Sequence, residues 1–175
     1  MDYEYYMEFA LEQAQIAFDH GEFPVGCVIV QDKKVIASGA RQGTTRNKSF
    51  FSEIDHAEIR ALKHLEKINI AFFPEKAIIF CTMEPCLMCF SAIILSGIKK
   101  IVYAYEDPMG GGTTCDLKNL PPLYKLSAIE VVSGVSRQKS LDFFYDFFDK
   151  EDNLYWKNSY LEEYTFNQKK EVNSK

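Results

Sequence analysis

Residues 77–105 read AIIFCTMEPCLMCFSAIILSGIKKIVYAY and contain three apolar segments of different lengths. The segment from Ala77 to Thr82 predicts a buried strand, Cys86 to Leu95 a buried helix, and Ile101 to Tyr105 a second strand. Two strands joined through a helix form a crossover unit, which favours parallel pairing of the strands. These residues therefore predict an α/β fold with a three-layer arrangement.

The segments before and after this unit supply further expected elements. Apolar residues at spacings of three and four predict an amphipathic helix over residues 3–20. β-branched runs at 25–30 and 35–37, separated by the polar residues 31–34, predict an antiparallel hairpin. The other expected elements are a long surface loop over 40–54, a helix over 56–68, a second long loop marked by 110–112 and 121–122, a short strand over 128–132 and a helix over 136–150.

The length of 175 residues suits one domain with one core. Hydrophobic residues make up 47% of the chain and charged residues 26%, which is ordinary globular usage and argues against disorder, collagen-like repeats and coiled coils. We expect a single domain over residues 1–169, with a core over about 3–150 and an aromatic C-terminal extension over 151–169. The extension is expected to pack against the chain or a partner, and residues 170–175 to be frayed.

Charge and cysteine content restrict the partners and the location. The formal charge of −5 gives the whole molecule no attraction for a phosphate backbone or an anionic membrane, so nucleic-acid binding needs a local basic patch. Five cysteines are an odd number for a disulfide framework, and the acidic start of the sequence does not resemble a secretion signal. The apolar runs fall far short of the roughly 20 residues of a membrane span. We therefore expect a cytoplasmic protein without a membrane partner.

Three residues have the chemistry of zinc ligands: His56, Cys86 and Cys89. Zinc binds imidazole nitrogen and thiolate sulfur in a tetrahedron, and three protein ligands leave the fourth position to water, as in catalytic sites. Pro85 suits the first turn of a helix, where its missing N–H costs nothing, and so places both cysteines at a helix N-terminus. Unpaired N–H groups and the helix dipole favour thiolates there. The ligand count predicts an open metal site.

Glu58 follows His56 by two residues, a spacing that points to opposite sides of a regular helix. Both side chains face one site only if that site lies at the end of the helix, and Asp55 before them makes position 56 a credible first-turn position. Glu58 would then stand beside a metal-bound water without binding the metal. A carboxylate in that position takes a proton from the water and returns it to the substrate.

Cys86 and Cys89 also allow other interpretations. A lone pair of cysteines at this spacing is often part of a helical core or a redox dithiol. A structural zinc site would need a fourth ligand, for which Cys27, Cys81 and Cys115 are candidates. Of these, Cys27 and Cys81 lie in apolar strand segments typical of core residues.

The motifs H-A-E at 56–58 and P-C-L-M-C at 85–89 resemble the H-x-E…P-C-x-x-C signature of zinc-dependent nucleobase deaminases. The segments FPVGCV at 23–28, HAEIRAL at 56–62 and TMEPCLMC at 82–89 resemble the bacterial tRNA adenosine deaminase branch of the cytidine and deoxycytidylate deaminase superfamily. This branch also contains guanine and cytosine deaminases. The resemblance covers about residues 3–150.

The resemblance implies an α/β/α cytidine-deaminase-like fold with a central mixed sheet, one catalytic zinc ion per chain and a homodimer. Zinc-bound hydroxide would attack the carbon that bears an exocyclic amine, and ammonia would leave. His56, Cys86 and Cys89 would be the zinc ligands, and Glu58 the catalytic acid and base. Arg41 stands where relatives often carry an Asn that holds the base. The residues expected to contact the substrate are Val25, Arg41, Pro85, Tyr105 and Asp107.

The first functional hypothesis is conversion of adenosine to inosine in tRNA, with the target base flipped into the zinc pocket. The loop before His56 supports it with the cations Arg41, Arg46 and Lys48 and the rings of Phe50 and Phe51. The same loop is equally well explained as a solvated segment with two buried rings.

The second hypothesis is deamination of a free nucleobase or nucleoside, with guanine, cytosine and adenine as candidate bases. The acidic residues 149–152 favour it because they repel a phosphate backbone, and the aromatic extension would close the pocket. The third is a zinc-binding scaffold without activity, against which the presence of Glu58 argues.

Overall fold

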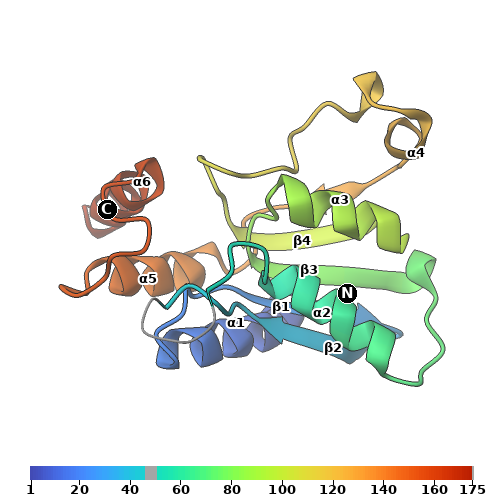
Figure 1. Cartoon of the computed structure of the whole chain (residues 1–175), viewed down its shortest axis with the longest axis horizontal. Helices are drawn as coiled ribbons and strands as arrows, with labels where there is room; N and C mark the ends of the chain where they lie inside the picture. The colour runs from blue at the N-terminus through green and yellow to red at the C-terminus, as the bar shows by residue number, and fades with distance from the viewer. Residues whose placement is uncertain (46–50, 175) are drawn as a thin grey trace.

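The computed structural model describes residues 1–45 and 51–174 and contains a five-stranded mixed sheet with the strand order β2-β1-β3-β4-β5 (Figure 1). β1 pairs antiparallel with β2 and β3, whereas β3, β4 and β5 are parallel. This confirms the predicted α/β fold with a central mixed sheet. The strands are β1 (Gly26–Gln31), β2 (Lys34–Ala40), β3 (Ala77–Met83), β4 (Lys100–Tyr105) and β5 (Glu130–Val132).

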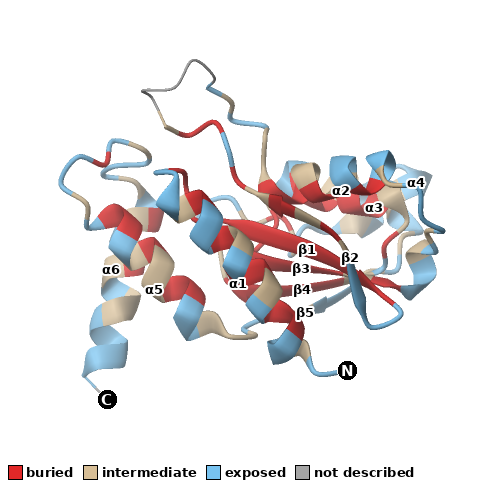
Figure 2. Cartoon of the chain, turned by 90° about the horizontal axis from the view of Figure 1, so that it is seen from below, coloured by how far each residue is buried: buried red, intermediate tan, exposed pale blue. Residues whose placement is uncertain are grey.

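Helices cover both faces of this sheet, as a three-layer fold requires. α1 and α5 lie on one face, and α2 and α3 lie on the other (Figure 2). The helices are α1 (Tyr3–Asp19), α2 (Ala57–Lys67), α3 (Leu87–Ser96), α4 (Pro122–Lys125), α5 (Arg137–Phe148) and α6 (Tyr160–Asn173), with short 3₁₀ turns at Pro74–Lys76 and Leu117–Asn119. None of the helices within the described ranges has the length and apolar character needed to cross a bilayer.

The two apolar faces follow from the alternation of side chains along each strand. Cys27, Ile29 and Cys81 face the layer of α2 and α3, whereas Val28 and Phe80 face α1. The strands β1, β3 and β4 are buried almost throughout because helices cover both of their faces. The predicted crossover is confirmed: α3 connects the parallel strands β3 and β4.

The hairpin turn is shorter than the predicted turn over 31–34. Gln31 pairs with Lys34 in the ladder, so the loop consists of Asp32 and Lys33. Both loop residues have positive φ, 49° and 63°, as a two-residue type I′ turn requires.

β2 and α2 approach each other closely at Gly39. A Cβ atom at this position would lie 2.2 Å from the carbonyl oxygen of Ala57 and 2.6 Å from the backbone nitrogen of Ala61. Because Gly39 has no side chain, the first turn of α2 packs directly on the strand. This contact sets the position of the helix end that follows His56.

The loop after β2, which we predicted as a long surface loop, is partly buried. Arg41 and Thr44 are buried, with 2% and 3% of their surface exposed. The backbone N–H and the hydroxyl of Thr44 both donate to the carboxylate of Glu22 at 2.7 Å, and this buried acceptor holds the loop against the end of α1. Phe51 is exposed, and the predicted contributors Arg46, Lys48 and Phe50 lie outside the described residues.

The C-terminal extension forms a helix that the sequence patterns did not indicate. Ser159 caps α6 by accepting a hydrogen bond from the backbone N–H of Glu162 at 3.2 Å, and Leu161 and Thr165 are buried against the rest of the chain. Residues 170–173, which we expected to be frayed, continue this helix. The expectation was wrong there because the cap and the buried positions support all turns of α6 as a unit.

Candidate active site

The candidate metal ligands lie at two neighbouring helix N-termini. His56 is the N-cap residue of α2, and Cys86 is the N-cap residue of α3, which follows directly after β3. Cys89 lies in the first turn of α3. The cysteine positions confirm the prediction of a helix N-terminus, except that Pro85 precedes the cap instead of occupying the first turn.

The three ligand atoms are close enough to share one ion. The His56 Nδ1 atom lies 3.5 Å from Cys86 Sγ and 3.4 Å from Cys89 Sγ, and all three atoms lie within 4.8 Å of one another. Tetrahedral zinc with bonds of about 2.0–2.3 Å keeps its ligands roughly 3.5–3.8 Å apart, so the group fits this metal. The described residues add no fourth His, Cys, Asp or Glu to the cluster, as expected for an open site.

The cysteine pair shares a negative charge beside His56. A hydrogen bond from the Cys89 thiol and a smaller effect of the His56 ring together lower the pKa of Cys86 to about 4, against the opposing effect of burial. The same hydrogen bond, together with burial, raises the pKa of Cys89. A thiolate next to an imidazole is a prepared site for a divalent cation, whose binding favours release of the second thiol proton.

Glu58 occupies the second position of α2 and is buried, with 3% of its surface exposed. Its Oε2 atom has no hydrogen-bond partner among the described residues. Burial raises the pKa of this carboxyl group, whereas the neighbouring His56 lowers it. A buried carboxylate oxygen without a protein partner needs a polar atom opposite it, which a water molecule or a substrate amine supplies.

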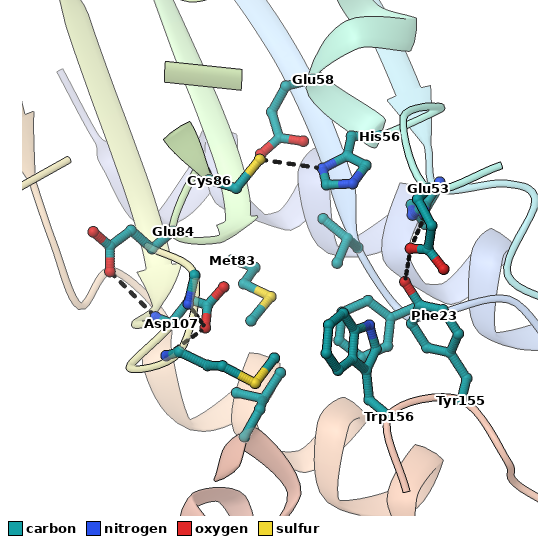
Figure 3. Close-up of a pocket in the computed structure, with 15 residues that line it drawn as sticks. Phe23, Glu53, His56, Glu58, Met83, Glu84, Cys86, Asp107, Tyr155 and Trp156 are labelled. Carbon is teal, nitrogen blue, oxygen red and sulfur yellow. Dashed lines mark hydrogen bonds and ion pairs between the residues drawn. The ribbon is translucent and has the colours of Figure 1, made fainter. Parts of the chain in front are cut away.

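These groups open into a cavity of about 630 Å³ that is large enough for a nucleoside (Figure 3). His56, Glu58 and Cys86 form one side of it. The other polar lining residues are Arg41, Glu53, Glu84 and Asp107, and the apolar and aromatic ones are Phe23, Val25, Met83, Met109, Tyr155, Trp156 and Leu161.

The substrate contacts that we predicted divide into two groups. Val25, Arg41 and Asp107 line the cavity. Pro85 and Tyr105 are absent from the lining formed by the described residues, and for Tyr105 the prediction was wrong. The Tyr105 side chain is fully buried, stacks on Phe144 of α5 and forms a hydrogen bond to Thr165 of α6 at 3.1 Å, so it is a core residue.

Arg41 lines the cavity, but its guanidinium group is already engaged. It donates hydrogen bonds to the carbonyl oxygens of Gln42 and Ser52, the latter at 2.9 Å, and lies 3.7 Å from the Glu53 carboxylate. These contacts hold the two ends of the 41–55 loop together. In this structure, Arg41 therefore shapes the wall of the cavity.

Glu84 organises the loop opposite His56. Its carboxylate accepts hydrogen bonds from the backbone N–H groups of Asp107 and Thr113, both at 3.2 Å, and from the Thr113 hydroxyl at 2.5 Å. A Cβ atom on Gly111 would lie 2.4 Å from this carboxylate, so the glycine lets the loop close over it. The run of glycines thus belongs to a tight loop beside the metal cluster.

The remaining cysteines lie outside the metal cluster. Cys27 and Cys81 face each other across β1 and β3 with 3.9 Å between their sulfur atoms, are fully buried and have pKa values raised by burial. Cys115 is exposed. The structure thus supports the interpretation of Cys27 and Cys81 as core residues.

Residues 1–105 match the family model described as the cytidine and deoxycytidylate deaminase zinc-binding region. The chain belongs to this family. It is therefore a zinc-dependent hydrolytic deaminase. The tRNA-specific adenosine deaminase of Bacillus subtilis (strain 168) is 33% identical to it over 136 residues, which are 78% of this chain and 82% of that protein. For the enzyme of the same name from Rickettsia felis the identity is 32% over 146 residues, 82% of this chain and 99% of the relative.

Solved structures agree with this assignment of the deaminase. A structure from a study of A-to-I editing by tRNA:A34 deaminases superposes with a TM-score of 0.65 and 30% identity, over 79% of this chain and 98% of that one. A guanine deaminase from Nitrosomonas europaea has a TM-score of 0.61 over 82% of this chain and 83% of its own, and at 20% identity it shares the fold.

The sequence patterns missed several residues of the deaminase cavity. Glu84 lies directly before the Pro-Cys motif, and its acidic side chain at the end of a buried strand was a usable signal. Glu53 and Trp156 gave no such signal, because they reach the cavity from a loop and from the C-terminal extension through tertiary packing.

Proposed function

We propose that this deaminase converts adenosine to inosine in tRNA, with His56, Cys86 and Cys89 as zinc ligands and Glu58 as the proton-transferring residue. The observation that carries the assignment of the site is the convergence of the three ligand atoms beside the unpartnered Oε2 of Glu58, at the side of a cavity of nucleoside size. The curated relatives that act on tRNA support the choice of substrate.

His56, Cys86 and Cys89 would hold the zinc ion, which would supply Lewis-acid activation of water. Residues of the chain transfer protons, exclude water and bind the substrate. Glu58 is positioned to accept a proton from an attacking water and to donate one to the departing amine. Burial raises the pKa of its carboxyl group, which favours retention of the proton between the two transfers. The apolar lining around Phe23 and Met83 excludes bulk water from the reacting base. Asp107, which lies across the cavity from Tyr155 and Trp156, is placed to accept a hydrogen bond from the substrate.

Deamination of a free base or nucleoside is the second candidate. One structural feature favours it: the chain's own C-terminal extension contributes Tyr155, Trp156 and Leu161 to the cavity and so narrows the space for a polynucleotide. Arg41 is the one Lys or Arg among the described lining residues. Its N–H groups donate to carbonyl oxygens and its guanidinium group lies 3.7 Å from the Glu53 carboxylate, which weakens its attraction for phosphate.

Ammonia release from a substrate panel separates the two candidates. The panel consists of an anticodon stem-loop with adenosine at the wobble position, free adenosine, and the bases adenine, guanine and cytosine. We expect the stem-loop to release ammonia. If a free base or nucleoside releases ammonia and the stem-loop does not, the alternative is established. His56→Ala, which removes a zinc ligand, is the matched inactive control, and zinc is measured on every sample.

We also propose a homodimer and a cytoplasmic location for the domain formed by residues 1–169. Exposed leucines on and beside α3 and α4 support the dimer: Leu95 is 58% exposed, Leu123 61% and Leu126 80%. The free state of all five cysteines supports a reducing compartment. Leu126→Asp is expected to shift the protein toward monomer in sedimentation velocity, whereas a wild-type protein that sediments as a monomer would refute the dimer.

A further inference from the structure

The C-terminal extension forms the side of the cavity that faces the metal cluster. Tyr155, Trp156 and Leu161 belong to its lining, and Trp156 lies across the cavity from His56 and Cys86 (Figure 3). These three residues lie beyond residues 1–105, which carry the match to the family model. This wall of the site is therefore a property of the extension and not of the zinc-binding region.

Local hydrogen bonds fix the backbone on both sides of Trp156. The Asn153 side chain accepts from the N–H of Tyr155 at 3.0 Å and donates to the carbonyl oxygen of Tyr155 at 3.2 Å. The Trp156 carbonyl oxygen accepts from the N–H of Ser159 at 3.1 Å, and Ser159 is the cap of α6. The turn that presents the indole is thus tied to the start of a helix.

Tyr155 connects this turn to the opposite loop of the cavity. Its ring packs on Phe23 with 5.3 Å between centroids, and its hydroxyl donates to Glu53 Oε2 at 2.9 Å. Glu53 in turn lies 3.7 Å from the guanidinium group of the buried Arg41. The extension and the 41–55 loop are therefore joined at the edge of the cavity, next to Trp156.

Trp156 itself has two features that its role in folding does not explain. Its φ angle of +54° lies in the left-handed region, which is unfavourable for a bulky side chain. In spite of this cost its side chain is not packed away, because Trp156 remains 44% exposed while lining the cavity. A flat aromatic face whose backbone is fixed by hydrogen bonds and which is left open to a cavity is suited to stack on a planar ligand.

We propose that Trp156 is a specificity-determining residue whose indole stacks on the substrate base, and that the Tyr155–Glu53 hydrogen bond positions it. The inference rests on the proposed deaminase function and adds the element that holds the base on the side opposite Glu58. Base stacking on an aromatic side chain is tolerant of base identity and depends on ring area, so it selects planar bases over other amines.

The sequence makes this stacking directly observable, since Trp156 is the single tryptophan of the chain. Excitation at the red edge of indole absorption therefore reports on Trp156 alone. We would titrate zinc-loaded Glu58→Gln protein, in which the base remains unconverted, with each member of the substrate panel. Saturable quenching by the member that the wild type deaminates is expected. Binding of that compound in equilibrium dialysis without any change in emission would overturn the proposal.

Kinetics of three variants test the same contact with a different readout. Trp156→Ala is expected to raise KM about 5- to 100-fold with a much smaller change in kcat, whereas Trp156→Phe, which keeps an aromatic face, recovers most of the loss. Tyr155→Phe removes the hydrogen bond to Glu53 and is expected to raise KM less than Trp156→Ala does. Tyr5→Ala, an exposed aromatic residue on α1, is the control and should leave KM unchanged.

Zinc content and melting temperature of each variant separate stacking from folding. If Trp156→Ala and Trp156→Phe change KM and kcat by the same amounts, or if Trp156→Ala leaves KM unchanged, the stacking role is contradicted. The deaminase assignment remains intact in either case. If the wild type deaminates and binds none of the panel, the proposed function fails and the stacking role fails with it.

Discussion

His56 caps α2, and this position explains how two side chains at a spacing of two residues reach one cavity. A cap residue has extended backbone, with φ −70° and ψ 155° here, so its side chain leaves the helix in a direction that later residues cannot take. Glu58 lies within the first turn of α2, and its side chain lines the same cavity as that of His56. The H-x-E spacing is therefore a helix-end motif, which is why it was predictable from Asp55 and the periodicity that follows.

Zinc retention should depend on each cysteine of the cluster. Cys86→Ser and Cys89→Ser are expected to lose bound zinc and, with it, at least about 100-fold in deaminase rate, because a hydroxyl group is a far weaker ligand than a thiolate. Metal analysis of the purified proteins checks this. Cys115→Ser, a change at an exposed position outside the cluster, is the control that should keep full zinc.

Other residues of the site were not predictable from sequence. Tyr105 was expected to contact the substrate, yet its side chain is fully buried and packs against Phe144 of α5 and Thr165 of α6. Asp107 itself follows the strand end and does reach the cavity. Trp156 is 67 or more residues away from His56, Cys86 and Cys89 in the sequence, so only the packing of the extension reveals it.

At the scale of elements, the backbone contact between β2 and α2 positions the catalytic end of the helix. Gly39→Ala would place a methyl group against the Ala57 carbonyl oxygen, so we expect a loss of about 1–3 kcal/mol in the free energy of unfolding and weaker zinc binding. Thermal or denaturant unfolding together with zinc titration measures both. Ser38→Ala, the neighbouring strand position, should change neither; an equally stable Gly39→Ala protein would show that α2 is free to shift.

A second contact between secondary-structure elements joins α6 to Glu106, which follows β4, and its contribution to stability depends on pH. Burial raises the pKa of Glu106, but hydrogen bonds from Arg137 and Tyr164 lower it by more, so the folded protein has the lower value. Arg137 Nε and the Tyr164 hydroxyl each donate to this carboxylate at 2.7 Å. A carboxyl group whose pKa is lower in the folded state stabilises the fold above its unfolded pKa, and this stabilisation disappears as pH falls through the folded value.

Glu106→Gln is therefore expected to destabilise the protein by roughly 1–3 kcal/mol at pH near 7. The difference from the wild type should shrink as the pH falls below about 4.5, where the unfolded chain begins to protonate Glu106, and vanish below the lower pKa of the folded state, where Glu106 is neutral in both states. Urea unfolding of both proteins across this range measures it. A difference that is constant with pH would show that the ionised state of Glu106 contributes nothing.

The elements themselves were largely predictable, and the extension was not. The hydrophobic periodicity of residues 77–105 indicated the strand, helix and strand that the structure contains, because burial on both faces leaves a strong pattern. α6 has mostly polar positions and buries little beyond Leu161 and Thr165, so its sequence carries a weak helical pattern. Its place against α5 depends on contacts with distant residues such as Tyr105.

For the whole molecule, the charge of −5 limits how an RNA substrate can bind. Each phosphate contact with single-stranded nucleic acid adds roughly 0.7 to the salt dependence of binding. If the stem-loop is the substrate, we expect log KM to rise with log salt concentration with a slope of at most about 2, because Arg41 is the one Lys or Arg among the described residues that line the cavity. KM for a free base should be independent of salt. A slope of about 5 for the stem-loop would show that an extensive cationic surface binds the RNA and would contradict this prediction.

The proposed mechanism assigns zinc binding to the metal cluster and proton transfer to Glu58, and the Glu58→Gln variant separates these two roles. Ammonia release and zinc content are measured on the same samples of wild-type and Glu58→Gln protein, with the substrate that the panel identifies. We predict unchanged zinc in the variant and a rate at least about 100-fold lower, since the amide cannot accept the proton. Deamination that continues at the wild-type rate with zinc bound would contradict the mechanism.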